Sequence, residues 1–405
     1  MKPHDAARDP AVFVDRRLKH LRGLGVGLWP CFEAGEETHD GVVLYQPREL
    51  VACTETTDFV RSQLGSRFGK TIDSTTRPDF TIFHLPEGVD SLDLSARLRC
   101  AEANVAPHPV LSLTQGVPRI GPGDDPRPHD GAGSPDPKKM KNDYKVAVVD
   151  TGILEASATG GVLPAAIDHP DVAAPGRIID WYGAAHGTFI HGIYQRRSPG
   201  VAVSHAKAVS DVGLVTLDSF VTETDAAVAD GLDVLNLSLG MYTAPGLGIP
   251  GLKSAVKRWI ETCAKQGKEL LIAAAAGNDA KSQRFYPAAL SDDPDVGHAI
   301  MSVGALDRPD DNGEQRPAVF SNYGNWVNAW APGVDLVSDY AGDGLEFQYD
   351  AASTLPFHGC AEWSGTSFAT PYAAAAVLRY ADDHGWSARA AWHEIRSGRP
   401  WVMFD

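Results

Sequence analysis

The sequence predicts an α/β protein in which a doubly wound, mostly parallel sheet follows a small α+β domain. From about residue 144 onward, short apolar runs alternate with longer segments of helical pattern, which is typical of βαβ units. Ahead of them, residues 117–143 are rich in proline, glycine and aspartate and predict an exposed linker without regular elements. We therefore expect an N-terminal domain over 1–116, a linker over 117–143 and a larger domain over 144–405.

Composition and charge limit the classes of partner. The chain has 405 residues, of which 43% are hydrophobic and 22% charged, as in a soluble globular protein with a large core. Its net charge is −16. A chain this acidic argues against nucleic acid or an anionic membrane surface as the partner.

The sequence also bears on the compartment of the protein. The N-terminus leads into charged residues without an apolar stretch, and the run 270–276 is too short to cross a bilayer. The five cysteines are scattered and odd in number, which favours buried or incidental thiols over a disulfide framework or a metal site. We expect a cytoplasmic protein, although a secreted protein that had lost its signal peptide would look the same.

In the smaller region, strand-like and helix-like segments alternate. A helix is expected near 12–22. The segments after it, in chain order, are strand 42–52, helix 58–67, strand 79–85, helix 91–101 and strand 105–113. This order predicts a compact α+β module.

In the larger region, four apolar runs read as buried parallel strands and two segments between them as helices. The strands are expected at 146–149, 234–239, 270–276 and 300–303, and the helices at 225–231 and 252–267. Active sites of such sheets lie at the carboxyl ends of the strands.

Two titratable side chains are candidates for such a site. Asp150 closes the first strand, where a partly desolvated acid can fix the tautomer of an imidazole; a helix cap or a metal ligand is an alternative. His186 is the first residue of a predicted helix and suits general-base chemistry, although a lone histidine is usually structural.

Further polar groups follow the later strands. Asn278 comes after the run 270–276 and could donate its amide to an oxyanion, or serve as a turn residue. Ser238, Leu239 and Gly240 could pair their backbone with an extended peptide. Ser367 lies in Gly-Thr-Ser-Phe-Ala-Thr-Pro, at the mouth of an alanine-rich segment, where a base and oxyanion donors would activate it.

Taken together, these motifs resemble the subtilisin-like serine peptidases, or subtilases. The chain shows Asp-Thr-Gly, His-Gly-Thr, Asn-Leu-Ser-Leu-Gly, Ala-Ala-Gly-Asn and Gly-Thr-Ser-Phe-Ala-Thr-Pro in this order, within about 144–396. The order acid, histidine, serine is that of the subtilisin triad.

The resemblance implies a role for each residue in a serine endopeptidase that forms an acyl-enzyme. Asp150 would orient the base His186, and Ser367 would be the nucleophile. Asn278 would give the side-chain donor of the oxyanion hole. One wall of the substrate pocket would be Ser238, Leu239 and Gly240, and the other Ala274 to Gly277, including Ala275. The alternative is a catalytically silent subtilase fold used for binding or as a scaffold.

The chain also departs from the family pattern. Phe189 stands where a second histidine is usual, Phe368 where a methionine is usual, and Tyr372 where a histidine is common, so we expect repacking there without loss of activity. Asp279 could favour a basic substrate residue or simply be solvated. A familiar calcium-binding loop after His186 is missing, so we expect no metal or other cofactor, although the acidic surface leaves room for weak calcium sites.

In this context the region 42–113 resembles the intramolecular-chaperone propeptide of subtilases. The resemblance implies a zymogen-like arrangement in which the tail, near 110–116, occupies the substrate cleft. A domain that recruits substrates or another partner is the alternative. The expected partners are thus a peptide or protein substrate and the chain's own N-terminal domain, with no nucleic acid or membrane.

Overall fold

The computed structural model describes residues 27–33, 36–100, 103–113, 126–131, 138–153, 178–179, 182–210, 213–243, 248–341, 346–348 and 354–405. The helix expected near 12–22 and the tail beyond Leu113 lie outside this part of the chain. The described residues form two compact units. The first contains 27–111 and Met241–Arg258, and the second contains 112–240 and Trp259–Asp405.

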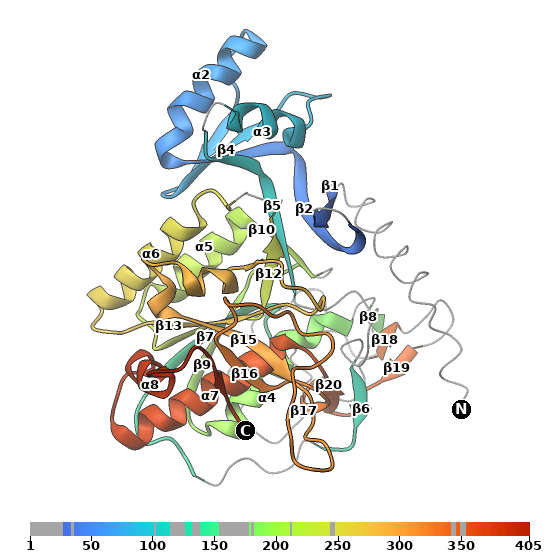
Figure 1. Ribbon diagram of the computed structural model, residues 1–405, viewed down its shortest axis with the longest axis vertical. Helices are drawn as coiled ribbons and strands as arrows, with labels where there is room; N and C mark the ends of the chain where they lie inside the picture. The colour runs from blue at the N-terminus through green and yellow to red at the C-terminus, as the bar shows by residue number, and fades with distance from the viewer. Residues whose placement is uncertain are drawn as a thin grey trace. The chain divides into compact units, whose positions relative to one another are not determined.

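The first unit is an antiparallel sheet packed against two helices (Figure 1). Central strand β2 pairs with β4 on one side and with β5 on the other, and β1 and β3 extend the sheet. The strands are β1 (Gly27–Glu33), β2 (Glu36–Cys53), β3 (Ser74–Thr76), β4 (Phe80–His84) and β5 (Val105–Leu113); the helices are α2 (Thr57–Phe68) and α3 (Ser91–Arg99), with a 3-10 turn at Thr54–Thr56.

Local sequence explains where these helices begin and end. Asp90 caps α3 by accepting the backbone N–H groups of Leu92 and Asp93. Gly69 ends α2 with a positive φ of 66°, which glycine adopts without strain. Leu64 and Leu98 bring both helices into one core. The predicted order of strand, helix, strand, helix, strand is present; the short polar β3 was not predicted.

A seven-stranded parallel sheet forms the second unit. Its order is β21-β16-β15-β13-β11-β7-β9, and every neighbouring pair is parallel. This confirms the predicted doubly wound α/β class. The bounds are β7 (Lys145–Asp150), β9 (Ala202–Lys207), β11 (Val234–Leu237), β13 (Leu271–Ala275), β15 (Ile300–Leu306), β16 (Ala329–Pro332) and β21 (Val402–Met403).

Helices lie on both faces of this sheet (Figure 1). Residues of α4, α7 and α8 share one buried cluster with alternate strand residues such as Val146 and Leu271. On the other side, α5 and α6 meet where the rings of Phe220 and Trp259 pack edge to face, 5.7 Å apart. The bounds are α4 (His186–Arg197), α5 (Leu217–Val228), α6 (Leu252–Lys265), α7 (Thr366–His384) and α8 (Ala388–Arg396).

Shorter strands complete the chain. A three-stranded sheet has the order β17-β20-β6, and another has the order β19-β18-β8. The bounds are β6 (Arg127–His129), β8 (Ile178–Ile179), β10 (Leu214–Thr216), β12 (Leu239–Tyr242), β14 (Phe285–Tyr286), β17 (Leu336–Asp339), β18 (Glu346–Gln348), β19 (Thr354–Pro356) and β20 (Cys360–Trp363), with 3-10 turns at Tyr182–Ala185, Ala288–Asp292 and Gly297–Ala299. In the described part of the chain, no helix has the length and apolar character needed to span a membrane.

Three local predictions need correction. The run 234–239 is not one strand, because it breaks at Ser238 into β11 and β12. Helix α5 begins at Leu217, earlier than expected, with the Thr216 side chain accepting the N–H of Ser219 as its cap. The stretch 117–143 is not without regular elements, since it contains β6.

Candidate active site

Asp150 and His186 form a buried pair at the carboxyl end of β7. Asp150 is the last residue of β7, and His186 is the first residue of α4; both are fully buried. The imidazole Nδ1 lies 2.9 Å from each carboxylate oxygen of Asp150. A carboxylate only accepts, so the imidazole donates its Nδ1–H to Asp150. Nε2 is buried and has no hydrogen-bond partner among the described residues.

Backbone contacts fix this pair. The N–H of Thr151 donates to the Asp150 carboxylate at 2.7 Å, and the Thr151 hydroxyl accepts the N–H of Gly187 at 3.0 Å. A Cβ on Gly187 would lie 2.3 Å from the carbonyl oxygen of Gly152, so only glycine allows this close approach. The start of α4 is thereby held against the end of β7.

Aromatic side chains enclose the His186 ring. The ring of Trp363 meets it edge to face at 5.5 Å, and that of Phe368 lies 5.2 Å away. Phe189 packs on Phe368 at 4.4 Å. The two phenylalanines that depart from the family pattern thus pack together beside the imidazole.

Ser367 lies in the first turn of α7, directly before Phe368. It is 1% exposed, and its hydroxyl donates to the carbonyl of Ser238 at 3.2 Å. In return the Ser238 hydroxyl donates to the carbonyl of Ser367 at 2.8 Å. Phe368, the next residue, packs against the His186 ring, whereas the hydroxyl of Ser367 is directed to Ser238 and does not hydrogen bond Nε2 of His186.

Asn278 follows β13 and lies against the residues that precede Ser367. Its Oδ1 accepts the backbone N–H of Thr366 at 2.9 Å and the Thr366 hydroxyl at 2.8 Å. A Cβ on Gly365 would lie 3.3 Å from the amide Nδ2. The oxygen of this amide is thus anchored, which fixes the direction of its NH₂ group.

An extended segment pairs with the predicted substrate wall. Leu239 and Gly240 of β12 pair antiparallel with Leu113 and Ser112, the last residues of β5. The N–H of Leu113 also donates to the carbonyl of Gly213 at 3.2 Å. All five residues belong to the second unit. This edge of β12 therefore pairs by its backbone with an extended segment of the same chain.

The other predicted wall has two different environments. Ala275 is buried inside the sheet and pairs with Val303. Gly277 lies beyond the strand, has a φ of 100° and donates its N–H to the Thr366 hydroxyl at 3.1 Å. Sequence reasoning missed Asn322, whose amide holds this loop by bonding the carbonyl of Ala276 and the N–H of Asp279. Asn322 lies in none of the motifs named above, and the sequence alone does not show which backbone groups its side chain contacts.

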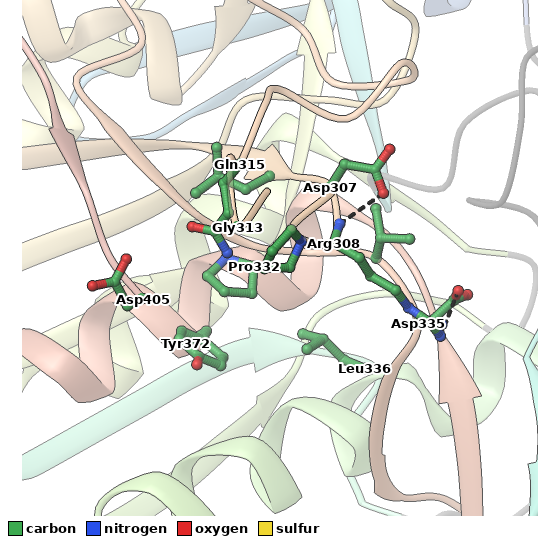
Figure 2. Close-up of a pocket in the computed structure, with 12 residues that line it drawn as sticks. Asp307, Arg308, Gly313, Gln315, Pro332, Asp335, Leu336, Tyr372 and Asp405 are labelled. Atoms are coloured by element: carbon green, nitrogen blue, oxygen red, sulfur yellow. Dashed lines mark hydrogen bonds and ion pairs between the residues drawn. The ribbon is translucent and has the colours of Figure 1, made fainter. Parts of the chain in front are cut away.

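A pocket of about 530 Å³ is lined by other residues (Figure 2). Arg308 and Asp335, which form an ion pair at 2.7 Å, line it together with Tyr372 and Leu336. None of the predicted site residues lines it. In the part of the chain that the structure describes, no cluster of three or more histidine, cysteine or acidic residues has the arrangement of a metal site.

Comparison with known proteins identifies the family. The chain is 28% identical over 263 residues to the thermophilic serine proteinase of Bacillus sp. strain AK1, covering 59% of this chain and 52% of that protein. It is 27% identical over 334 residues to the alkaline protease of Alkalihalobacillus alcalophilus, covering 77% and 71%. The first of these matches spans only about half of the relative's length.

The solved structures agree at the level of fold. Fervidolysin of Fervidobacterium pennivorans, described as a keratinolytic enzyme related to subtilisin, superposes with a TM-score of 0.53 at 17% identity, covering 88% of this chain and 57% of that one. The sequence model of the subtilase family (Peptidase_S8) matches residues 141–397, which include Asp150, His186 and Ser367. This chain therefore belongs to the subtilase family.

Proposed function

We propose that this protein is a serine endopeptidase that cleaves peptide bonds through an acyl-enzyme. The Ser367 oxygen attacks the scissile carbonyl while Nε2 of His186 takes the hydroxyl proton. Asp150 stabilises the imidazolium that forms. His186 then gives the proton to the leaving amine, and a water molecule activated by the same imidazole releases the acyl group and restores the serine.

The hydrogen bonding of His186 carries this proposal. A buried structural histidine normally satisfies both ring nitrogens, because an unpaired buried polar atom is costly. Here Nδ1 is held by both oxygens of Asp150, whereas Nε2 is left without a partner among the described residues. A base that must accept a proton from a serine hydroxyl needs this arrangement.

Asn278 and the backbone N–H of Ser367 are the proposed oxyanion donors. The negative charge of the tetrahedral intermediate is stabilised by donors that are already oriented before the reaction. The two hydrogen bonds from Thr366 to Oδ1 of Asn278 supply that preorganisation, since they prevent the amide from turning over.

The N-terminal region is proposed to restrain the enzyme. Ser112 and Leu113 pair with Gly240 and Leu239, the same backbone groups that we assign to the substrate. While this pairing persists, a substrate peptide cannot use that edge. The chain would therefore be a latent precursor, activated when it is cut after Leu113 and the N-terminal region that carries Ser112 and Leu113 is released.

The activity is tested by labelling with a fluorophosphonate probe. The wild-type chain should react at Ser367, and the Ser367→Ala variant should not. Equal labelling of the two proteins would exclude Ser367 as the nucleophile. Hydrolysis of a fluorogenic peptide by the wild-type chain, without the probe, distinguishes an enzyme from a silent scaffold.

Self-processing is tested by intact mass. We expect the wild-type chain to be cut between Leu113 and Arg127, because Arg127–His129 is held in the second unit as β6. The Ser367→Ala variant should keep its full mass. Identical full-length masses for both proteins would remove self-processing while leaving activity on other substrates intact.

A further inference from the structure

Proline at position 371 leaves the carbonyl of Ser367 without its helical partner. In an α-helix a carbonyl accepts the N–H of the residue four positions later. For Ser367 in α7 that residue is Pro371, which has no N–H. A buried carbonyl needs another donor. The hydroxyl of Ser238 supplies it at 2.8 Å.

This contact fixes the direction of a longer chain of hydrogen bonds. A carbonyl only accepts, so the Ser238 hydroxyl must give its one hydrogen to Ser367. The Ser238 oxygen in turn accepts Nδ2 of Asn236 at 3.0 Å. Oδ1 of Asn236 then faces Tyr194, whose hydroxyl donates to it at 3.0 Å. Each of these four residues is at most 1% exposed.

We propose that Tyr194 is a positioning residue for the nucleophile and acts through Asn236 and Ser238. The proposal rests on the proposed function. With the phenol present, the amide of Asn236 can present only its NH₂ group to Ser238. Without it, Oδ1 loses that donor, and the amide can turn over and accept the Ser238 hydrogen instead. The carbonyl of Ser367 would then lose its donor.

Two features make this arrangement effective. Burial raises the pKa of Tyr194 well above its usual value, so the phenol remains a donor throughout the working pH range. Tyr194 also lies on α4, the helix that begins with His186, about two turns further on. One helix thus presents the base and supports the residue that holds the nucleophile, so the two are positioned together.

The test compares Tyr194→Phe with Tyr144→Phe, each prepared as the full-length chain and allowed to process itself, with the cut verified by intact mass. Tyr144 is also buried and donates its hydroxyl to a carbonyl, that of Trp386, at 2.8 Å. Steady-state hydrolysis of a fluorogenic peptide is measured, with active sites counted by fluorophosphonate titration. We expect Tyr194→Phe to lower kcat about fivefold with KM unchanged, the size of one lost buried hydrogen bond. Tyr144→Phe should leave kcat unchanged, while thermal unfolding shows a similar loss of stability in both variants.

A double variant tests the route. If Tyr194 acts through Ser238, Tyr194→Phe combined with Ser238→Ala should be no slower than Ser238→Ala alone. Effects that multiply, or a kcat of Tyr194→Phe equal to that of wild type, would overturn the inference and leave the proposed function standing. A wild-type chain that neither reacts with the probe nor cleaves peptide would overturn both.

Discussion

Two histidines behind the candidate site form a pair that should make the fold sensitive to acid. Nδ1 of His191 lies 2.9 Å from Nε2 of His205. His191 is on α4, five residues after His186, and His205 is on β9, opposite Val148 of β7. The outer nitrogens of both rings, Nε2 of His191 and Nδ1 of His205, are buried without a partner among the described residues. One ring donates its N–H to the other in this bond while both rings are neutral. Protonation of either ring would therefore place a charge in the buried pair.

The size of the effect follows from the pKa values. Burial lowers the pKa of His191 from 6.5 to about 4, against an opposing effect of Asp339, which already pairs with Arg196. Burial and the adjacent His191 lower the pKa of His205 well below its usual value. Below pH 6.5 the unfolded chain therefore binds protons that the folded chain does not, and stability falls as the pH drops toward 4. From His191 alone we expect a loss of about 2 kcal/mol between pH 7.5 and pH 5, and His205 adds to it.

The assay is urea unfolding followed by tryptophan fluorescence in Ser367→Ala, which cannot digest itself. The unfolding free energy is compared near pH 7.5 and near pH 5 in this parent and after His191→Gln with His205→Gln. Between pH 7.5 and pH 5, the unfolding free energy of the parent should fall by about 2 kcal/mol or more beyond the fall seen in the double variant. His129→Gln, an exposed histidine on β6, should behave as the parent does. The same pH dependence in parent and double variant would refute the reasoning.

Three further substitutions give distinct outcomes. Asn278→Leu should lower kcat about 10²–10³-fold, because it removes a proposed oxyanion donor, with the circular dichroism spectrum unchanged. Gly187→Ala should lower kcat and the unfolding temperature, because the added Cβ would lie 2.3 Å from the Gly152 oxygen. We expect the free energy of unfolding to fall by about 1–3 kcal/mol. A variant as active and stable as wild type would contradict this close contact. Arg258→Ala should destabilise the first unit by about 3 kcal/mol in urea unfolding, because the buried Asp79 carboxylate would lose its cation. Asp79 is 7% exposed and accepts a hydrogen bond from Nε of Arg258 at 3.1 Å.

The fold was predictable where burial alone decides the structure. Strands of a parallel sheet covered on both faces are continuous apolar runs, and β7, β13 and β15 lie where such runs predict them. The run 234–239 misled for a physical reason. Asn236 and Ser238 are polar residues buried within it, and they are satisfied by Tyr194 and Ser367, which are distant in sequence. A local pattern does not show such partners.

Composition misled in the stretch 117–143 for a related reason. Residues 127–129, Arg-Pro-His, have little strand propensity. They form β6 because they pair with β20 as the edge strand of a three-stranded sheet, a position where proline is tolerated. Arg127 also lies 2.7 Å from both Asp335 and Glu362. Tertiary pairing and charge therefore override the local preference.

In the candidate site, the order of motifs predicted that Asp150 and His186 pair, but not what surrounds them. Asp150 and His186 are hydrogen bonded as expected, whereas the aromatic wall around His186 could not be read from the sequence. Trp363, part of that wall, is the last residue of β20, and β6 pairs along that same strand. The segment that the sequence assigned to the linker therefore supports the wall of the imidazole. A cut before Arg127 would preserve this support, whereas a cut beyond His129 would detach the edge strand from the chain that carries Ser367.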